Sequence, residues 1–327
     1  MLAFRARPPR AAATSRRCRW LRRSRRRRRG VLGGALDRAV GPSCSQNQAR
    51  GLRIFWLTAG HPFTITVVIV TSPSDESPDM TLDYLSIISD ETSRIVSDYE
   101  RGRYAAVPWS DRWTVGTVAR HVAGTHHVVA EVVRGRPDAN FGLFAELRTP
   151  PKDSPEFVEW FRSGTASLLG QLSSVPADDE CWSWFASGRC VGWWARRMAF
   201  EAVVHRWDTD AAQGQDFSVT PQIAADGVDE FLDVFVAASR AAHDSPPGPA
   251  ISFECSDQSD RWWLDLSERG NRIVSRDPRA ASVQIRGTAE QLLLIVWGRV
   301  PIPHAVGAEV FGDVGELERW SDLIPPM

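Results

Sequence analysis

The chain has 327 residues, enough for two ordinary domains, and its net charge of −1 is distributed very unevenly. Residues 1–79 hold 16 arginines and 4 acidic residues, a net charge of +12, which leaves −13 for residues 80–327. So acidic a body argues against nucleic acid as a partner, because it would repel phosphates.

The first 79 residues form an Arg-rich extension that we predict to be disordered. Like charges such as the arginines at 25–29 repel one another, and the segment has little apolar patterning with which to fold. Such a tract fits nucleic-acid binding, a transit peptide or a translation start assigned too early. We favour the last interpretation, with Met80 as initiator, because a regular helical pattern begins directly after it. The apolar run 63–70 is far shorter than the ~20 residues that cross a membrane, so we expect no membrane span.

Apolar residues after Met80 recur with the helical period and predict a four-helix bundle over residues 80–215. Small polar residues, one of them followed by proline, mark the helix starts, and glycines mark several of the ends. The predicted helices span residues 81–102, 113–135, 154–172 and 193–212.

A second pattern follows residue 215 and predicts a smaller α+β domain over residues 216–327. Thr220 and Pro221 begin another helix, and residues 245–249 read as a linker. Beyond it come four runs typical of strands, at 251–255, 262–266, 272–275 and 282–286. A helix over 288–297 and a short one over 314–323 complete the domain.

The five cysteines contain no Cys-x-x-Cys pair, and two of them lie in the Arg-rich extension. This is a poor basis for a disulfide framework or for a thiolate zinc site. We therefore expect a cytoplasmic protein.

Glu201 and His205 lie four residues apart on the predicted fourth helix, so they project from one face about a turn apart. A carboxylate and an imidazole placed in this way can bind the same divalent ion. By itself the spacing is more typical of a solvated surface pair.

His121 lies in the middle of the predicted second helix, beside the apolar stripe through Val118 and Thr125. We expect it to face the bundle interior, where a lone histidine is usually a hydrogen-bonded core residue. Bundle cores nevertheless build metal sites from side chains on facing helices. Three protein ligands would leave one coordination position open, which is the catalytic pattern. At ~100° per residue, His126 and His127 should point away from this site.

Three segments resemble a known family. Residues 113–121 (Trp-Thr-Val-x-x-Val-x-x-His) and 201–208 (Glu-x-x-x-His-Arg-Trp-Asp) are similar to the two signatures of the mycothiol-dependent maleylpyruvate isomerase family, within the DinB-like superfamily. The run 286–299 and the Phe-Gly-Asp at 311–313 resemble that family's second, sterol-carrier-like domain. The resemblance covers residues 80–324.

The resemblance implies a zinc-type divalent ion held by His121, Glu201 and His205, an active site between the two domains, and mycothiol as the thiol cofactor. Our candidate for a catalytic contact to an anionic substrate is Arg299, for which a role as a helix-end arginine is an equally good interpretation. Phe200 stands where relatives often carry a histidine just before the metal-binding glutamate.

The implied chemistry is activation of a small-molecule thiol. A thiol with a pKa of ~8.5 is mostly protonated at neutral pH, and coordination to a divalent cation deprotonates it. In an isomerase the thiolate adds to a cis double bond, allows rotation and leaves, whereas in an S-transferase the adduct is released. Both reactions use the same open metal position. Asp208, one turn beyond His205, either orients a ligand or caps the helix, and we favour the cap.

Two other functions compete with the thiol-dependent enzyme. One is a non-catalytic module that binds a small molecule or lipid in the C-terminal domain, with the bundle as scaffold. The other is a metal hydrolase that uses water in the open position. The expected partners are a small-molecule thiol and an electrophile, with neither nucleic acid nor membrane, and the residues specify no oligomeric state.

Overall fold

The computed structural model describes residues 82–317, with gaps at 141, 144–146, 186–187, 238–248, 269–270, 277 and 302–306. The Arg-rich extension, the proposed start at Met80, the apolar run 63–70 and most of the predicted linker fall outside the described residues. Among the described helices, none combines the length and the apolar character needed to span a membrane.

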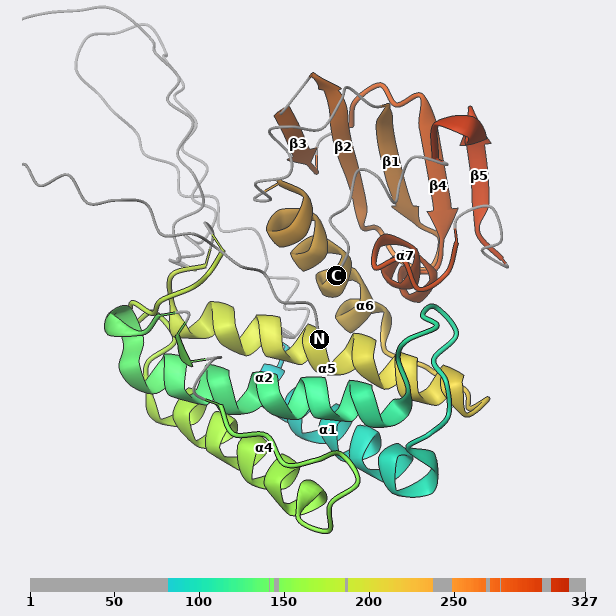
Figure 1. Cartoon of the computed structure of the whole chain (residues 1–327). Helices are drawn as coiled ribbons and strands as arrows, with labels where there is room; N and C mark the ends of the chain where they lie inside the picture. The colour runs from blue at the N-terminus through green and yellow to red at the C-terminus, as the bar shows by residue number, and fades with distance from the viewer. Residues whose placement is uncertain are drawn as a thin grey trace, which may run out of the picture. The chain divides into compact units, whose positions relative to one another are not determined.

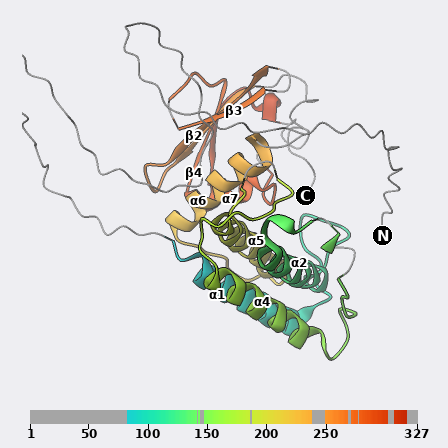
Figure 2. The same ribbon diagram turned by 90° about the vertical axis from the view of Figure 1, so that its left-hand side faces the viewer.

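Four long helices lie side by side and form the predicted bundle (Figure 1; viewed more nearly along the helices in Figure 2). α2 packs against α4 and α5, and α1 packs against the same two helices. The helices are α1 (Tyr84–Gly102), α2 (Val115–Gly135), α4 (Phe157–Ser174) and α5 (Val191–Ala212). The predicted apolar stripes are buried, as Val122 and Leu168 illustrate.

The helix ends follow local side-chain chemistry, with two departures from prediction. Thr114 caps α2 through a reciprocal capping box with Thr117, as the sequence suggested. α1 was expected to begin at residue 81, but it is capped by Asp83, whose carboxylate accepts hydrogen bonds from two backbone N–H groups. α4 begins at Phe157 rather than at Ser154, because residues 154–156 form a turn before the helix.

The C-terminal region contains α6, a sheet and α7. α6 (Pro221–Phe231) is capped by Thr220 and continues into a wider π-helical segment, η2 (Leu232–Ala237). The sheet has five strands in the order β3-β2-β1-β4-β5, and only the β1–β4 pair is parallel. The strands are β1 (Ala250–Cys255), β2 (Arg261–Glu268), β3 (Asn271–Ser275), β4 (Val283–Gly287) and β5 (Glu309–Gly312).

This region confirms the predicted α+β class and adds one strand. The four predicted strands form close to their expected bounds, and α7 (Ala289–Val296) occupies the predicted helix. β5 was not predicted, and within the described part the last helix is a short 3₁₀ turn, η5 (Val314–Leu317).

α6 lies against both α5 and α7, at a position where glycine allows close approach. A Cβ atom added to Gly227 would come within 2.7 Å of the Leu293 side chain and 3.0 Å of the Phe200 ring. Arg196 on α5 also binds the Asp226 carboxylate, at 2.7 Å from Nη2 to Oδ1. The aromatic core of the C-terminal region therefore joins the core of the bundle in one cluster. The domain boundary at residue 215 stays a prediction.

Candidate metal centre and aromatic cavity

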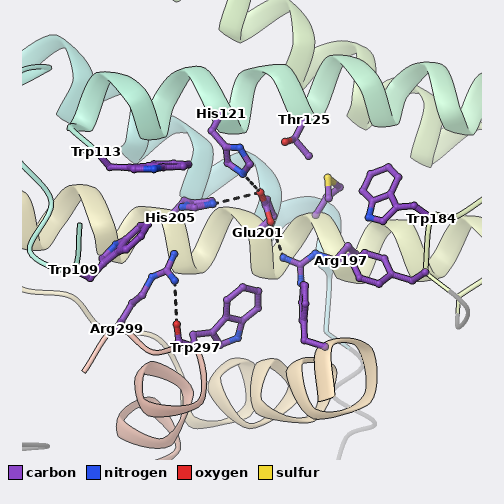
Figure 3. A pocket seen from close by; sticks show the side chains of 13 residues that line it. Trp109, Trp113, His121, Thr125, Trp184, Arg197, Glu201, His205, Trp297 and Arg299 are labelled. Carbon is purple, nitrogen blue, oxygen red and sulfur yellow. Dashed lines mark hydrogen bonds and ion pairs between the residues drawn. The ribbon is translucent and has the colours of Figure 1, made fainter. Parts of the chain in front are cut away.

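His121, Glu201 and His205 meet between α2 and α5 (Figure 3). One ligand atom from each lies within 4.8 Å of the other two. His121 Nε2 is 2.7 Å from Glu201 Oε1, and His205 Nε2 is 3.4 Å from the same oxygen. The sequence placed these three residues on two helices, and the fold brings them together.

Exposure differs among the three residues. The side chains of Glu201 and His205 are 12% and 10% exposed, whereas that of His121 is 42% exposed. The expectation that His121 faces the bundle interior is therefore wrong. The α2 surface at His121 borders a cavity, so the imidazole reaches Glu201 from the accessible side.

Asp208 orients the imidazole of His205. His205 Nδ1 donates a hydrogen bond to Asp208 Oδ2 at 2.8 Å, which turns Nε2 toward Glu201. The Trp113 ring stacks on the same imidazole, with centroids 6.1 Å apart and planes 8° from parallel. The preferred role for Asp208, a helix cap, is wrong, because α5 continues to Ala212 and the carboxylate binds side chains instead.

Arg197 holds the other oxygen of Glu201. Its Nη2 donates to Glu201 Oε2 at 2.8 Å, while Nη1 donates to Glu230 on α6 at 2.5 Å. Sequence reasoning missed both Arg197 and Glu230. Arg197 precedes Glu201 by four residues, so its spacing was a usable signal, but nothing local pointed to Glu230.

The protonation equilibria show that this centre attracts positive charge. Burial would raise the pKa of Glu201, but hydrogen bonds from His121 and His205 outweigh it and hold that pKa well below its usual value. Burial would lower the pKa of His205, yet bonds to Asp208 and Glu201 raise it. When His205 is neutral and its Nδ1–H donates to Asp208, the Nε2 atom carries a lone pair that faces Glu201 Oε1. A cation between them removes that repulsion, so two imidazoles and one carboxylate suit a divalent ion.

Arg299, which follows α7, forms a buried ion pair with Asp208. Its Nε donates to Oδ1 at 2.8 Å and its Nη2 to Oδ2 at 3.0 Å, while Nη1 donates to the Trp297 carbonyl. Trp109 Nε1 also donates to Asp208 Oδ1, at 2.6 Å. Burial would raise the pKa of Asp208, but the charge of Arg299 and the His205 hydrogen bond lower it. Arg299 thus borders the cavity but gives its donors to protein groups.

The centre opens into a cavity of about 390 Å³ whose wall is mostly apolar. The bundle contributes one side of the wall, and η2 and the segment after α7 contribute the other. Besides the three ligand candidates and the two arginines, the wall contains Trp109, Trp113, Thr125, Trp184, Phe185, Met198, Phe235 and Trp297.

Three other residues lie apart from the centre. His126 is buried and bonds Thr165, and burial lowers its pKa to about 4, which keeps the imidazole neutral. His127 bonds the carbonyl of Trp160. The prediction that these two histidines point away from the site is confirmed. Phe200 packs against Tyr84 and α6, outside the cavity, so its departure from the family pattern does not change the cavity wall.

Comparisons with known proteins agree with this architecture. The family model described as "Mycothiol maleylpyruvate isomerase N-terminal domain" matches residues 87–210, and "MDMPI C-terminal domain" matches residues 222–319. The chain in the crystal structure of a mycothiol-dependent maleylpyruvate isomerase superposes on this one with a TM-score of 0.51 and 15% sequence identity. The match covers 72% of this chain and 94% of that one. A mutant of that enzyme with one histidine replaced by alanine has the same identity and coverage and a TM-score of 0.48. No curated protein matches in sequence.

Proposed function

This chain belongs to the mycothiol-dependent maleylpyruvate isomerase family, and on that premise we propose that it is a metal-dependent enzyme that joins mycothiol to a small electrophile. The enzyme either isomerises the electrophile, as maleylpyruvate isomerase does by its name, or releases the adduct as an S-transferase. The observation that carries this proposal is the convergence of His121, Glu201 and His205 at the wall of a mostly apolar cavity.

Each residue of the proposed centre has a distinct task. His121, Glu201 and His205 would hold a divalent ion, zinc as the first candidate, which would lower the pKa of a bound thiol. Asp208 keeps the His205 proton on Nδ1, so that Nε2 can act as a ligand. Arg197 engages one Glu201 oxygen and leaves the other directed at both histidines.

Aromatic side chains of the wall hold the two imidazoles in place. Trp113 covers the His205 ring, and its edge-on contact with His121, at 5.4 Å between centroids, fixes that ring as well. An electrophile bound in the cavity would lie against these mostly apolar walls, beside the three candidate ligands. Isomerisation and transfer share this first addition and differ only in whether the sulfur leaves again.

For Arg299 we propose a positioning role. Support comes from its two hydrogen bonds to Asp208, the residue that orients His205. A direct contact with an anionic substrate, one of the two interpretations of Arg299 in the sequence, would share a guanidinium whose charge Asp208 already balances.

The test is metal content together with thiol turnover. The full-length protein should hold about one divalent ion per chain, and His121→Ala and His205→Ala should lose it together with chelator-sensitive mycothiol consumption. His127→Gln is the matched control on the same helix and should retain both. Full metal retention in both alanine variants would refute the centre. Binding of an apolar ligand that a chelator does not change, together with no thiol turnover, would favour the binding module. Metal-dependent hydrolysis without thiol would favour the hydrolase.

A further inference from the structure

We propose that the electrophile of this protein is uncharged and carries an aromatic or similarly flat apolar group, so that the cavity is unsuited to a dicarboxylate such as maleylpyruvate. The reaction assigned to this ligand rests on the proposed function. The preference of the cavity for an uncharged ligand does not, and can be measured without thiol or metal.

Six aromatic rings line the cavity in two groups. Trp109 and Trp113, with centroids 5.6 Å apart, lie near His205. The second group forms a continuous row, with successive centroid separations of 6.0, 5.3 and 5.2 Å, through Trp184, Phe185, Phe235 and Trp297. A cavity of about 390 Å³ between two such groups has the size and the character of a site for a small flat ligand.

Both cationic side chains of the wall already have carboxylate partners. Arg197 is 3% exposed and divides its fork between Glu201 and Glu230, while stacking near Phe235 and Trp297. Arg299 binds both oxygens of Asp208. Among the described residues that line the cavity, no other lysine or arginine is present to receive a substrate carboxylate.

The charge balance of the centre leads to the same conclusion. Two guanidinium groups face three carboxylates, those of Glu201, Glu230 and Asp208. A divalent ion and one thiolate bring this group to neutrality. A dicarboxylate would then add two negative charges against aromatic walls that offer it no unpaired cation among the described lining residues, and that desolvation is strongly unfavourable.

An uncharged ligand is compatible with the same first chemical step. The sulfur of the thiol forms a bond to the β-carbon of an activated double bond, and the C=C π bond breaks. The proton lost from the thiol ends on the α-carbon through solvent, so no oxidant or further co-reactant is needed. Release of this adduct makes the reaction an S-transfer.

Binding of a matched pair of unreactive ligands tests the inference. Methyl 3-benzoylpropanoate is uncharged, and 3-benzoylpropanoate has the same aryl ketone with a free carboxylate; neither contains a C=C bond. Titration calorimetry of the full-length protein, either with metal and mycothiol both bound or with both removed, should show the ester binding at least about tenfold more tightly, because the carboxylate lacks a partner. Equal or tighter binding of the carboxylate would overturn the inference.

A substitution in the wall sharpens this test. Thr125 lies on α2 one turn beyond His121, and its side chain borders the cavity (Figure 3). Thr125→Lys adds a free cation there and should reverse or abolish the preference for the ester, while Thr125→Val should keep it. An unchanged preference in a folded Thr125→Lys protein would contradict the charge argument.

Turnover separates failure of the inference from failure of the proposed function. With mycothiol, methyl 3-benzoylacrylate should be consumed faster than 3-benzoylacrylate. Ester binding without metal-dependent consumption would leave the inference standing and remove the proposed function. Metal-dependent consumption of both compounds with a preference for the carboxylate would support the proposed function and overturn the inference.

Discussion

The bundle supplies all three side chains of the candidate metal centre, whereas the C-terminal region reaches the same cavity with one arginine and two aromatic rings. His121, Glu201 and His205 come from α2 and α5, which pack directly against each other. Arg299 and Trp297 follow α7, and Arg299 lies 91 residues beyond Asp208. The difference leads us to propose a division of labour, in which the bundle would determine whether a metal binds and the C-terminal region would determine how well the centre is held and what fits beside it.

The largest effect is expected for a change within the bundle. Glu201→Gln keeps the size of the side chain but removes the charge that both histidines face. Metal affinity should fall by more than the roughly 10–100-fold that accompanies loss of a group behind a ligand. Competition with a chromogenic chelator measures this affinity. Glu131→Gln, at an exposed position on α2, is the control, and equal affinity in the two variants would contradict the division of labour.

Asp208→Asn should have the next largest effect, because Asp208 serves both regions. The neutral amide orients His205 less well, and metal affinity should fall about 10–100-fold. Arg299 would also remain buried without its carboxylate, which costs about 3–5 kcal/mol of unfolding free energy. Chelator competition and chemical denaturation measure the two effects. Loss of stability with unchanged metal affinity would restrict Asp208 to a structural role.

Arg299→Gln tests whether the C-terminal arginine contacts substrate or acts through Asp208. We expect kcat to fall by about tenfold, at the lower end of the range for groups that act behind a ligand, and metal affinity to weaken in parallel. KM should change by the same factor for charged and uncharged electrophiles. A rise in KM confined to the charged electrophile would instead make Arg299 a substrate contact.

The smallest effect is expected where α6 packs on the bundle without touching the cavity. Gly227→Ala places a methyl group against Leu293 and Phe200, and overpacking of this kind costs about 1–3 kcal/mol. Thermal denaturation should show this loss, while metal content stays unchanged. Gly170→Ala is the control, since a Cβ atom there meets nothing within 4 Å. Loss of metal in the Gly227 variant would mean that the centre depends on the packing of α6.

Much of the fold could be predicted because its signals are local. Thr114 and Thr220 cap the helices that the sequence assigned to them, and the apolar period identified the buried faces. β5 was missed because it is only four residues long and its side chains are mostly exposed, so it lacks the alternation that marks a half-buried strand.

The ligand triad could also be anticipated, but the groups that hold it could not. Glu201 and His205 could be recognised because they lie four residues apart on one helix. Glu230 and Arg299 reach Arg197 and Asp208 from distant parts of the chain, and no helical or strand period relates such pairs. His121 lies beside Glu201 and His205, as expected, but its predicted burial was wrong, because periodicity cannot show that a cavity lies beside the helix.

The carboxylate of Asp208 is shared by a ligand histidine and an arginine from the other region, and this sharing has a thermodynamic consequence. If the packed C-terminal region strengthens metal binding by some free energy, a bound metal strengthens the packing of that region by the same amount. The two equilibria form one thermodynamic cycle. An apo protein would then hold its two regions together less firmly than a loaded one. Supply of metal in the cell would thereby govern the integrity of the whole cavity as well as its reactivity.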